Sequence, residues 1–382
     1  MNYPETKLPK VGTTIFTQMS QLAAQHNALD LSQGFPDFDG PTALLDAVGH
    51  HISSGANQYA PMAGVPALRE AIAEKVSRFY GGHYCAEREI TITSGATEAL
   101  FAAISAVVRT GDEVIMFDPA YDSYEPAVEI NGGTTVRLQL SAPHFKVDWQ
   151  AVRDAITAKT RLIILNSPHN PTGTTLTQHD LDTLADMLAG TDILVLSDEV
   201  YEHIVFDGEQ HQSVAGHEAL RERSFVVSSF GKTYHITGWK VGYCLAPAAL
   251  SAELRKVHQY LTFAISTPMQ LAIADYMAGA PNYGFELPAF YQQKRDLFCR
   301  LMASSRFELL PTQGTYFQLV DYRAIKDVPD IEFCQWLIEQ AGVVAIPISV
   351  FYQTPPDTRI VRFCFAKGEA TLKAAAERLV NL

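Results

Sequence analysis

From about residue 89 onward, short apolar runs rich in β-branched residues alternate with longer stretches of helical patterning. This alternation is typical of a parallel sheet with crossover helices, because parallel neighbouring strands need long connections. The predicted strands are REITIT, EVIMFD, RLIILNSP, DILVLSDE and SFVVSS. SGATEALFAAISAVVR predicts an alanine-rich helix, and a further helix over 177–189 begins at Thr177 with Asp180 as its capping-box partner. We therefore expect an α/β fold, a mostly parallel sheet with helices on both faces.

The pattern changes near residue 285. One long helix is predicted for LPAFYQQKRDLFCRLMASS, and strands are predicted for GTYFQLVDY and TRIVRFCFA, around a helix at 331–341. This mixture predicts a smaller α+β domain over residues 285–382. We expect residues 41–284 to form the large, ligand-binding domain, and residues 1–40 to form an N-terminal arm and part of the small domain.

The composition is ordinary for a soluble globular enzyme: 382 residues, 47% hydrophobic and 19% charged. The formal net charge of −13 repels polyanions, so neither nucleic acid nor an anionic membrane is expected as a partner. Five cysteines are scattered without a CxxC pair, and no HExxH motif or His/Cys/carboxylate cluster predicts a metal site. The chain starts without an apolar signal segment, and no apolar run approaches about 18 residues. We therefore expect a cytoplasmic protein.

Polar loops follow the predicted strands, and open α/β sheets bind ligands at the carboxyl ends of their strands. One of these loops, SFGKTYHITGWK, contains Lys232 between a glycine and a threonine. A phosphate-binding P-loop would need a glycine five positions before Gly231, where the sequence has Val226. Lys232 is therefore a candidate for covalent attachment of a cofactor.

A second loop, SDEVYEH, places Asp198 directly after a strand that is otherwise apolar. A buried carboxylate without a cationic partner is strongly unfavourable. Capping of the next turn is the alternative explanation for this residue. Together with Lys232 in the next strand-loop, it indicates pyridoxal phosphate, which needs a lysine for a Schiff base and an acid at its ring nitrogen.

Three motifs resemble, in order and spacing, the signature of class I pyridoxal-phosphate aminotransferases of fold type I: NSPHNPTG, SDEVYEH and SFGKTYHITGWKVGY. Three more are similar to the kynurenine and glutamine aminotransferase branch of this family: LSQGFPDFDGP, ANQYAPMAGVPALREAIA and RFCFAK. The resemblance covers nearly the whole chain. Lys240 stands where many class I members have arginine, and this branch commonly shares that departure.

The resemblance implies roles for four residues around the cofactor ring. Lys232 would form the Schiff base and then move a proton between the substrate α-carbon and the cofactor. Asp198 would keep the ring nitrogen protonated. Asn170 and Tyr201 would bind the phenolic oxygen of the ring, and Asn170 is also typical of a turn at its Asn-Pro dipeptide.

The cofactor phosphate would lie at the start of the helix predicted for SGATEAL. Gly95, Ala96 and Thr97 would offer backbone amides at the positive end of the helix dipole. Ser229 and Lys240 would complete this part of the site. For Ala96, plain packing of an alanine-rich helix remains an alternative.

Tyr121 of DPAYDSY would stack on the ring, although an ordinary core aromatic is an alternative in a chain with sixteen tyrosines. Arg362, in the apolar run IVRFCFA, would bind the substrate α-carboxylate with its planar fork, and Gly34 would add a backbone contact. A structural salt bridge is the alternative for Arg362. Tyr59 of NQYAP would reach the phosphate of the neighbouring subunit, which implies a homodimer with shared active sites.

We therefore expect an aminotransferase that moves the amino group of methionine, or of a large apolar or aromatic amino acid, to a 2-oxo acid in a ping-pong cycle. Phe16, Tyr59, Tyr121 and Phe351 are candidates for an apolar wall of the substrate site. Kynurenine transamination, a carbon–sulfur β-lyase and a cyclopropane-forming synthase are alternatives that keep the cofactor. A ligand-sensing transcription regulator is a remote alternative, because the first forty residues lack a basic DNA-binding segment.

Overall fold

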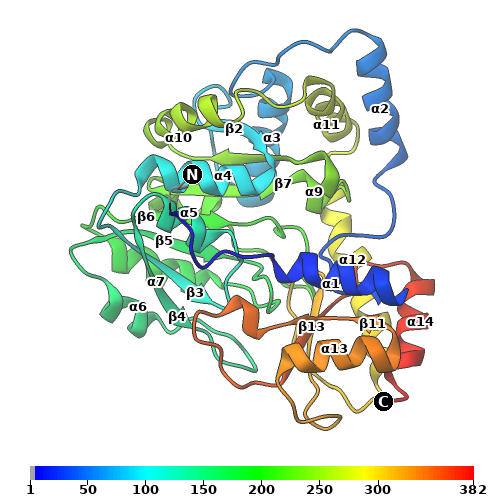
Figure 1. Ribbon diagram of the computed structural model, residues 1–382. Helices are drawn as coiled ribbons and strands as arrows, with labels where there is room; N and C mark the ends of the chain where they lie inside the picture. Colours follow the sequence, from blue (N-terminus) through cyan, green and yellow to red (C-terminus); the bar gives the residue numbers. More distant parts are fainter. Residues whose placement is uncertain (1–4) are drawn as a thin grey trace.

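The computed structural model describes residues 5–382. Within these residues the largest feature is a seven-stranded sheet, in which β8 runs antiparallel to its two neighbours and all other neighbouring pairs are parallel (Figure 1). The mostly parallel α/β fold predicted from the sequence is therefore confirmed. In spatial order the strands are β2 (Ile90–Ser94), β8 (Val241–Leu245), β7 (Ser224–Ser229), β6 (Leu194–Asp198), β5 (Thr160–Asn166), β3 (Glu113–Asp118) and β4 (Thr134–Gln139).

Three adjacent parallel strands end in polar residues at one edge of this sheet. β5 ends at Asn166, β6 ends at Asp198 and β7 ends at Ser229. In the strand register, Asn166 lies opposite Asp198. The apolar interiors of the strands are buried, so the polar residues come together where the strands leave the core.

Both faces of the sheet are covered by helices, because alternate strand residues point to opposite faces. In β5, Ile163 and Leu165 belong to one buried cluster, whereas Leu162 and Ile164 belong to the other. The second cluster contains residues of α4 (Gly95–Val107), α5 (Tyr124–Ile130) and α10 (Ala248–Leu261). The first contains residues of α2 (Thr42–Ser53), α3 (Pro66–Tyr80), α6 (Trp149–Ala155), α7 (Gln178–Leu188), α8 (Glu218–Arg221), α9 (Phe230–Thr233) and α11 (Thr267–Gly279).

Helix α7 begins as predicted: Thr177 is its N-cap and forms the complete capping box with Asp180. Two strands of the large sheet were not predicted from the pattern. β4 is an edge strand whose residues are half-buried or exposed, so it lacks a continuous apolar run. β8 follows β7 through α9 and the short helix η2 (Thr237–Trp239), a connection that only an antiparallel strand permits.

The C-terminal part forms a second, four-stranded antiparallel sheet in the order β12, β13, β10, β9. The long helix and the two strands predicted for this part are present. The helix begins at Tyr283, four residues before its predicted start at Leu287. The elements of this part are α12 (Tyr283–Met302), β9 (Glu308–Leu309), β10 (Phe317–Asp321), α13 (Asp330–Ala341), β11 (Val343–Val344), β12 (Ile346–Pro347), the short helix η3 (Ser349–Phe351), β13 (Ile360–Cys364) and α14 (Glu369–Leu379). A further short helix, η1 (Val214–Gly216), precedes α8.

The N-terminal segment joins this C-terminal part. α1 (Ile15–His26) lies among the C-terminal helices in Figure 1, and β1 (Leu29–Asp30) pairs in parallel with β11. Of the arm predicted over residues 1–40, the first four residues lie outside the described part. Every helix of residues 5–382 is too short or too polar to cross a bilayer.

Candidate active site

A cavity of about 260 Å³ lies at the carboxyl edge of the large sheet, where the N-terminal segment and the C-terminal sheet close over it. Its walls contain every site residue predicted from the sequence except Tyr59 and the wall candidate Phe351. The predicted residues that line it are Gly34, Gly95, Ala96, Thr97, Tyr121, Asn170, Asp198, Tyr201, Ser229, Lys232, Lys240 and Arg362. The structure thus brings together residues that are up to 328 positions apart, from Gly34 to Arg362.

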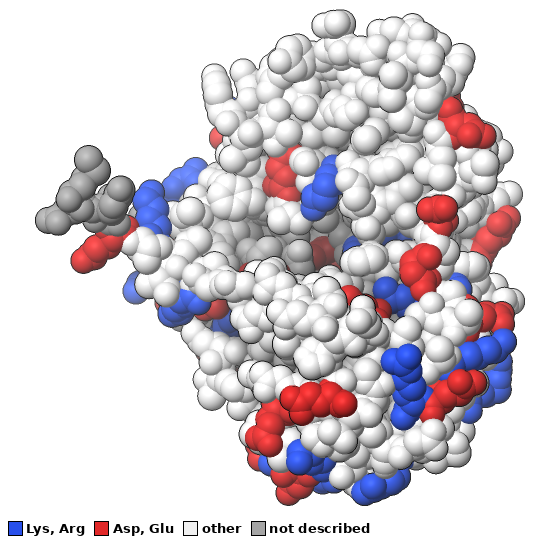
Figure 2. All heavy atoms as spheres, turned by 45° about the vertical axis from the view of Figure 1, so that its right-hand side comes forward, with Lys and Arg blue, Asp and Glu red and all other residues white. Residues whose placement is uncertain are grey.

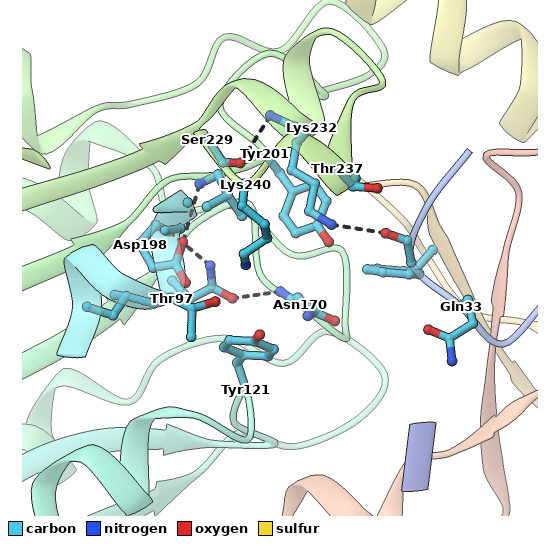
Figure 3. Close-up of a pocket in the computed structure, with 18 of the residues that line it drawn as sticks. Gln33, Thr97, Tyr121, Asn170, Asp198, Tyr201, Ser229, Lys232, Thr237 and Lys240 are labelled. Carbon is cyan, nitrogen blue, oxygen red and sulfur yellow. Dashed lines mark hydrogen bonds between the residues drawn. The ribbon is translucent and has the colours of Figure 1, made fainter. Parts of the chain in front are cut away.

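Lys232 lies on α9, directly after β7 ends at Ser229. The Ser229 side chain caps this short helix by accepting a hydrogen bond from the Gly231 amide. Lys232 Nζ points into the cavity (Figure 3) and donates to the Gly34 carbonyl oxygen at 3.0 Å and to Tyr316 Oη at 2.9 Å. Burial lowers the pKa of the Lys232 amine to about 8. A neutral, reactive amine is therefore accessible near neutral pH.

Asp198 lies across the cavity from Lys232 (Figure 3) and is 3% exposed. Burial raises the pKa of its carboxyl group to about 6, although Tyr124 Oη donates to Asp198 Oδ2 at 2.6 Å and opposes that shift. The Val200 amide also donates to the other carboxylate oxygen. A carboxylate buried in this way suits a cationic partner supplied by a ligand.

The start of α4 forms one end of the cavity. Its N-cap Ser94 makes no side-chain capping bond, so the first helix amides are free to bind an anion. Gly95 has φ +66°, and a Cβ atom there would lie 3.2 Å from Lys240 Nζ. The ammonium group of Lys240 therefore stands directly over the helix start, and together they form a cationic cradle.

Arg362 lies in β13, is 1% exposed, and reaches the same cavity from the second sheet. It donates to Asn170 Oδ1 at 2.7 Å and to the Ser32 carbonyl oxygen at 3.0 Å, while its Nε has no hydrogen-bond partner in the described chain. The guanidinium carbon is 3.8 Å from the centre of the Phe317 ring. Because its partners in residues 5–382 are neutral oxygens, burial lowers the pKa of Arg362 to about 10. The arrangement favours an incoming anion over the structural salt bridge.

Asn170 and Tyr201 lie between these groups. The Asn170 side chain accepts from Arg362, and its backbone amide donates to Asn166 Oδ1 at 2.8 Å, so the turn at HNPTG and a place in the site coexist. The buried Tyr201 ring packs against Tyr316 with 5.1 Å between centroids.

Tyr59 lies apart from the cavity. Its side chain is 85% exposed, and its ring meets Phe263 edge to face at 5.3 Å.

Five polar neighbours of the site were not predicted from the sequence, namely Gln33, Tyr124, Asn166, Thr237 and Tyr316. Tyr124 and Asn166 belong to the DPAYDSY and NSPHNPTG segments that were already singled out. The signal that pointed to them is their position, Asn166 at the end of β5 and Tyr124 shortly after β3. Tyr316 directly precedes β10 of the other sheet, and its sequence surroundings resemble an ordinary strand.

The family "Aminotransferase class I and II" matches residues 26–379. The chain belongs to the class I and II aminotransferases. The methionine aminotransferase of Escherichia coli K12 is 59% identical over 379 residues, which are 99% of this chain and 98% of the relative. Human kynurenine–oxoglutarate transaminase 1 is 33% identical and covers 95% of this chain and 94% of its own length.

Comparison with solved structures supports the same family assignment. The crystal structure of YbdL from Escherichia coli, a protein identified as having a methionine aminotransferase function, matches this aminotransferase with a TM-score of 0.97 at 57% identity and full coverage of both chains. N-succinyldiaminopimelate aminotransferase from Mycobacterium tuberculosis matches with a TM-score of 0.95 at 38% identity, covering 99% of this chain and 100% of its own. The family, the fold type and the enzyme class predicted from the motifs are confirmed.

Proposed function

We propose that this aminotransferase binds pyridoxal 5'-phosphate in the cavity between Lys232 and Asp198. When bound, that group supplies an aldehyde and an electron-withdrawing ring. Three features of the cavity fit it: the cradle of Gly95 and Lys240 for a phosphate, a buried carboxylate for a ring nitrogen, and an amine of lowered pKa on the opposite side. The placement of Lys232 and Asp198 across one cavity is the observation on which the proposal depends.

Each residue has a defined task in this proposal. Lys232 Nζ would hold the cofactor, and its free amine would take the proton from the substrate α-carbon. Asp198 would keep the ring nitrogen protonated, and the Tyr124 hydroxyl keeps the Asp198 carboxylate in place. The side-chain nitrogen of Asn170 and the hydroxyl of Tyr201 would bind the ring oxygen, and Tyr121 would pack on the ring.

The phosphate is bound by the amides of Gly95, Ala96 and Thr97, and by the side chains of Ser229 and Lys240. At the other end, Arg362 binds the substrate α-carboxylate. The Gly34 carbonyl is already bonded to Lys232 and Tyr316, so Gly34 has its N–H to offer the substrate.

We propose methionine, or a large apolar or aromatic amino acid, as the amino donor. The Escherichia coli relative acts on methionine, and the rings of Phe16 and Phe351 lie 5.9 Å apart, each within 6 Å of the Arg362 guanidinium carbon. Aromatic rings next to the carboxylate anchor provide an apolar surface, and thioethers pack favourably on such rings.

We further propose a cytoplasmic homodimer in which Tyr59 serves the neighbouring subunit's site. Its exposure and its distance from its own cavity support this assignment. The pairing of β1 with β11 supports the proposed division into a large domain over 41–284 and a small domain made of 285–382 and the N-terminal arm.

The Lys232→Ala variant tests the proposed function. It should lose transamination of methionine and should no longer be labelled when pyridoxal phosphate is added and the protein is treated with borohydride. Lys294→Ala is the matched control, since Lys294 is also partly buried but bonds to the Lys367 carbonyl oxygen outside the cavity. Wild-type turnover in Lys232→Ala would refute the proposal. A panel of donors tests the substrate: methionine and phenylalanine should exceed aspartate by about tenfold or more in kcat/KM.

A further inference from the structure

The Lys232 amine and the Tyr316 hydroxyl share one acceptor. Lys232 Nζ donates to the Gly34 carbonyl oxygen and to Tyr316 Oη, and the Tyr316 hydroxyl donates to the same carbonyl oxygen at 2.5 Å. A phenol has a single proton, and here that proton is directed at Gly34. The lone pairs of Tyr316 Oη therefore face the lysine, so the phenol is an acceptor for the amine.

The hydroxyl of Tyr316 is held rigidly. Its side chain is fully buried and lies against three rings, with centroid distances of 5.1 Å to Tyr201, 5.7 Å to Tyr291 and 5.0 Å to Phe317. A ring packed on three sides has little freedom to change rotamer. The oxygen that receives Lys232 therefore has a fixed position relative to Tyr201.

The backbone before Tyr316 is strained. Thr315 has φ +66°, a left-handed conformation that β-branched residues rarely adopt, and it is fully buried. Its amide donates to the Ile204 carbonyl oxygen at 2.9 Å, which ties it to the loop that carries Tyr201. Backbone strain of this kind persists where the surroundings fix it and clusters at functional sites.

We propose that Tyr316 is a positioning residue for transamination: its phenolic oxygen fixes the Lys232 amine beside Gly34 and favours the protonated form of that amine. The inference rests on the proposed role of Lys232 and deepens it. Tyr316 directly precedes β10 of the second sheet and Lys232 lies on α9, just after β7 of the first, so the place of the reacting amine depends on how the two sheets meet.

The sign of the effect follows from the contacts. Burial lowers the pKa of Lys232, and an acceptor for its ammonium opposes that lowering. Removing the Tyr316 oxygen leaves the ammonium with fewer acceptors. In Tyr316→Phe the Lys232 pKa should therefore fall by about one unit. The less basic and less fixed amine should take the substrate proton more slowly, so kcat should fall about tenfold. KM should stay nearly unchanged, because Arg362 is untouched.

The pKa can be measured without activity. Protein freed of cofactor and labelled with [ε-¹³C]lysine is titrated by NMR, and the Lys232 signal is the one missing from Lys232→Ala. Tyr291→Phe is the matched control: this ring also packs on Tyr316, but its hydroxyl bonds to His235 Nδ1 at 2.9 Å. The control should leave both the Lys232 pKa and kcat at their wild-type values.

An unchanged Lys232 pKa in Tyr316→Phe would overturn the inference, and so would an equal fall in the Tyr291→Phe control. If Tyr316→Phe does not fold, 3-fluorotyrosine placed at position 316 keeps the ring and weakens the oxygen as an acceptor. A smaller pKa fall in the same direction is then expected, and no fall overturns the inference. The proposed function has its own failure, an active Lys232→Ala variant, so the two failures can be told apart.

Discussion

At the residue scale, the two opposed charges of the site have pKa values that burial shifts in opposite directions. Burial raises the pKa of Asp198 to about 6 and lowers that of Lys232 to about 8. Both shifts disfavour the charged form, because the protein removes each group from water without fully replacing its solvation. Before a ligand binds, the charged form of each group is therefore poorly solvated, and keeping it in the site lowers the stability of the folded chain.

That cost has a pH range, which Lys232→Met should reveal in protein freed of cofactor. The pKa of Lys232 falls from 10.5 to about 8 on folding, so stability is lost as the pH falls through 8. A neutral side chain avoids this loss. The free energy of unfolding of the variant minus that of wild type should be compared at two pH values. This difference should be more favourable to the variant at about pH 6.5 than at about pH 10, by about 1–3 kcal/mol. Urea unfolding at both pH values measures this. The exposed Lys373→Met should show no such dependence, and a gain independent of pH would contradict the charge explanation.

Residues with a strand-end motif were predictable, and residues defined by a distant contact were not. Asp198, Asn170 and Lys232 follow strands in recognisable loops, and they line one cavity. Tyr124 and Tyr316 are two of sixteen tyrosines, and their importance lies in single hydrogen bonds to Asp198 and Lys232. Such bonds depend on how separate elements pack, which periodicity does not report.

At the scale of elements, a buried ion pair ties α3 to the back of the site. Lys75 Nζ lies 2.5 Å from Glu202 Oε1 and 2.6 Å from Tyr243 Oη, and Tyr80 Oη donates to the other carboxylate oxygen at 2.6 Å. Burial alone would raise the pKa of Glu202, but Lys75 and the hydrogen bonds outweigh it and hold this pKa well below its usual range. Glu202 directly follows Tyr201, so the pair joins α3, β8 and the Tyr201 loop.

Breaking this pair should be far more harmful than removing it whole. Lys75→Met should lower the free energy of unfolding by about 3–5 kcal/mol, because Glu202 is left buried and uncompensated. The double variant Lys75→Met/Glu202→Gln should recover a large part of that loss, since neither charge remains. Guanidinium unfolding of the single and double variants measures both effects. A double variant as unstable as the sum of the single ones would show that the pair is not coupled.

The elements themselves were predictable to the extent that their patterns are local. The capping box of α7 and the apolar runs of β5, β6 and β7 are local signals, and the structure contains them. β8 was missed because strand–helix alternation describes parallel crossovers, whereas β8 returns antiparallel beside β7. The pairing of β1 with β11 joins residues more than 300 positions apart, and two-residue strands have no periodicity to detect.

At the scale of the whole molecule, an aromatic patch suits a second copy of the chain. Tyr59, Tyr260, Leu261 and Phe263 are exposed by 85%, 86%, 49% and 44%. The nearby helices α2 and α11 carry one aspartate each and neither lysine nor arginine. Charged side chains are correspondingly sparse on the upper part of the face in Figure 2. Apolar patches of this kind mark protein interfaces, which agrees with the proposed homodimer.

If Tyr59 serves the neighbouring site, two inactive or impaired variants should repair each other. In a hybrid of Lys232→Ala with Tyr59→Ala, one site contains Lys232 from one subunit and Tyr59 from the other, and is intact. Co-expressed subunits with different tags, purified for both tags, should therefore recover about half of the wild-type activity per dimer. Each variant alone should remain inactive or weak. Lys373→Ala, an exposed residue outside the cavity and outside this patch, is the control and should behave like wild type in the same assay. Hybrids no more active than the average of their parents would show that each subunit builds its site from its own residues.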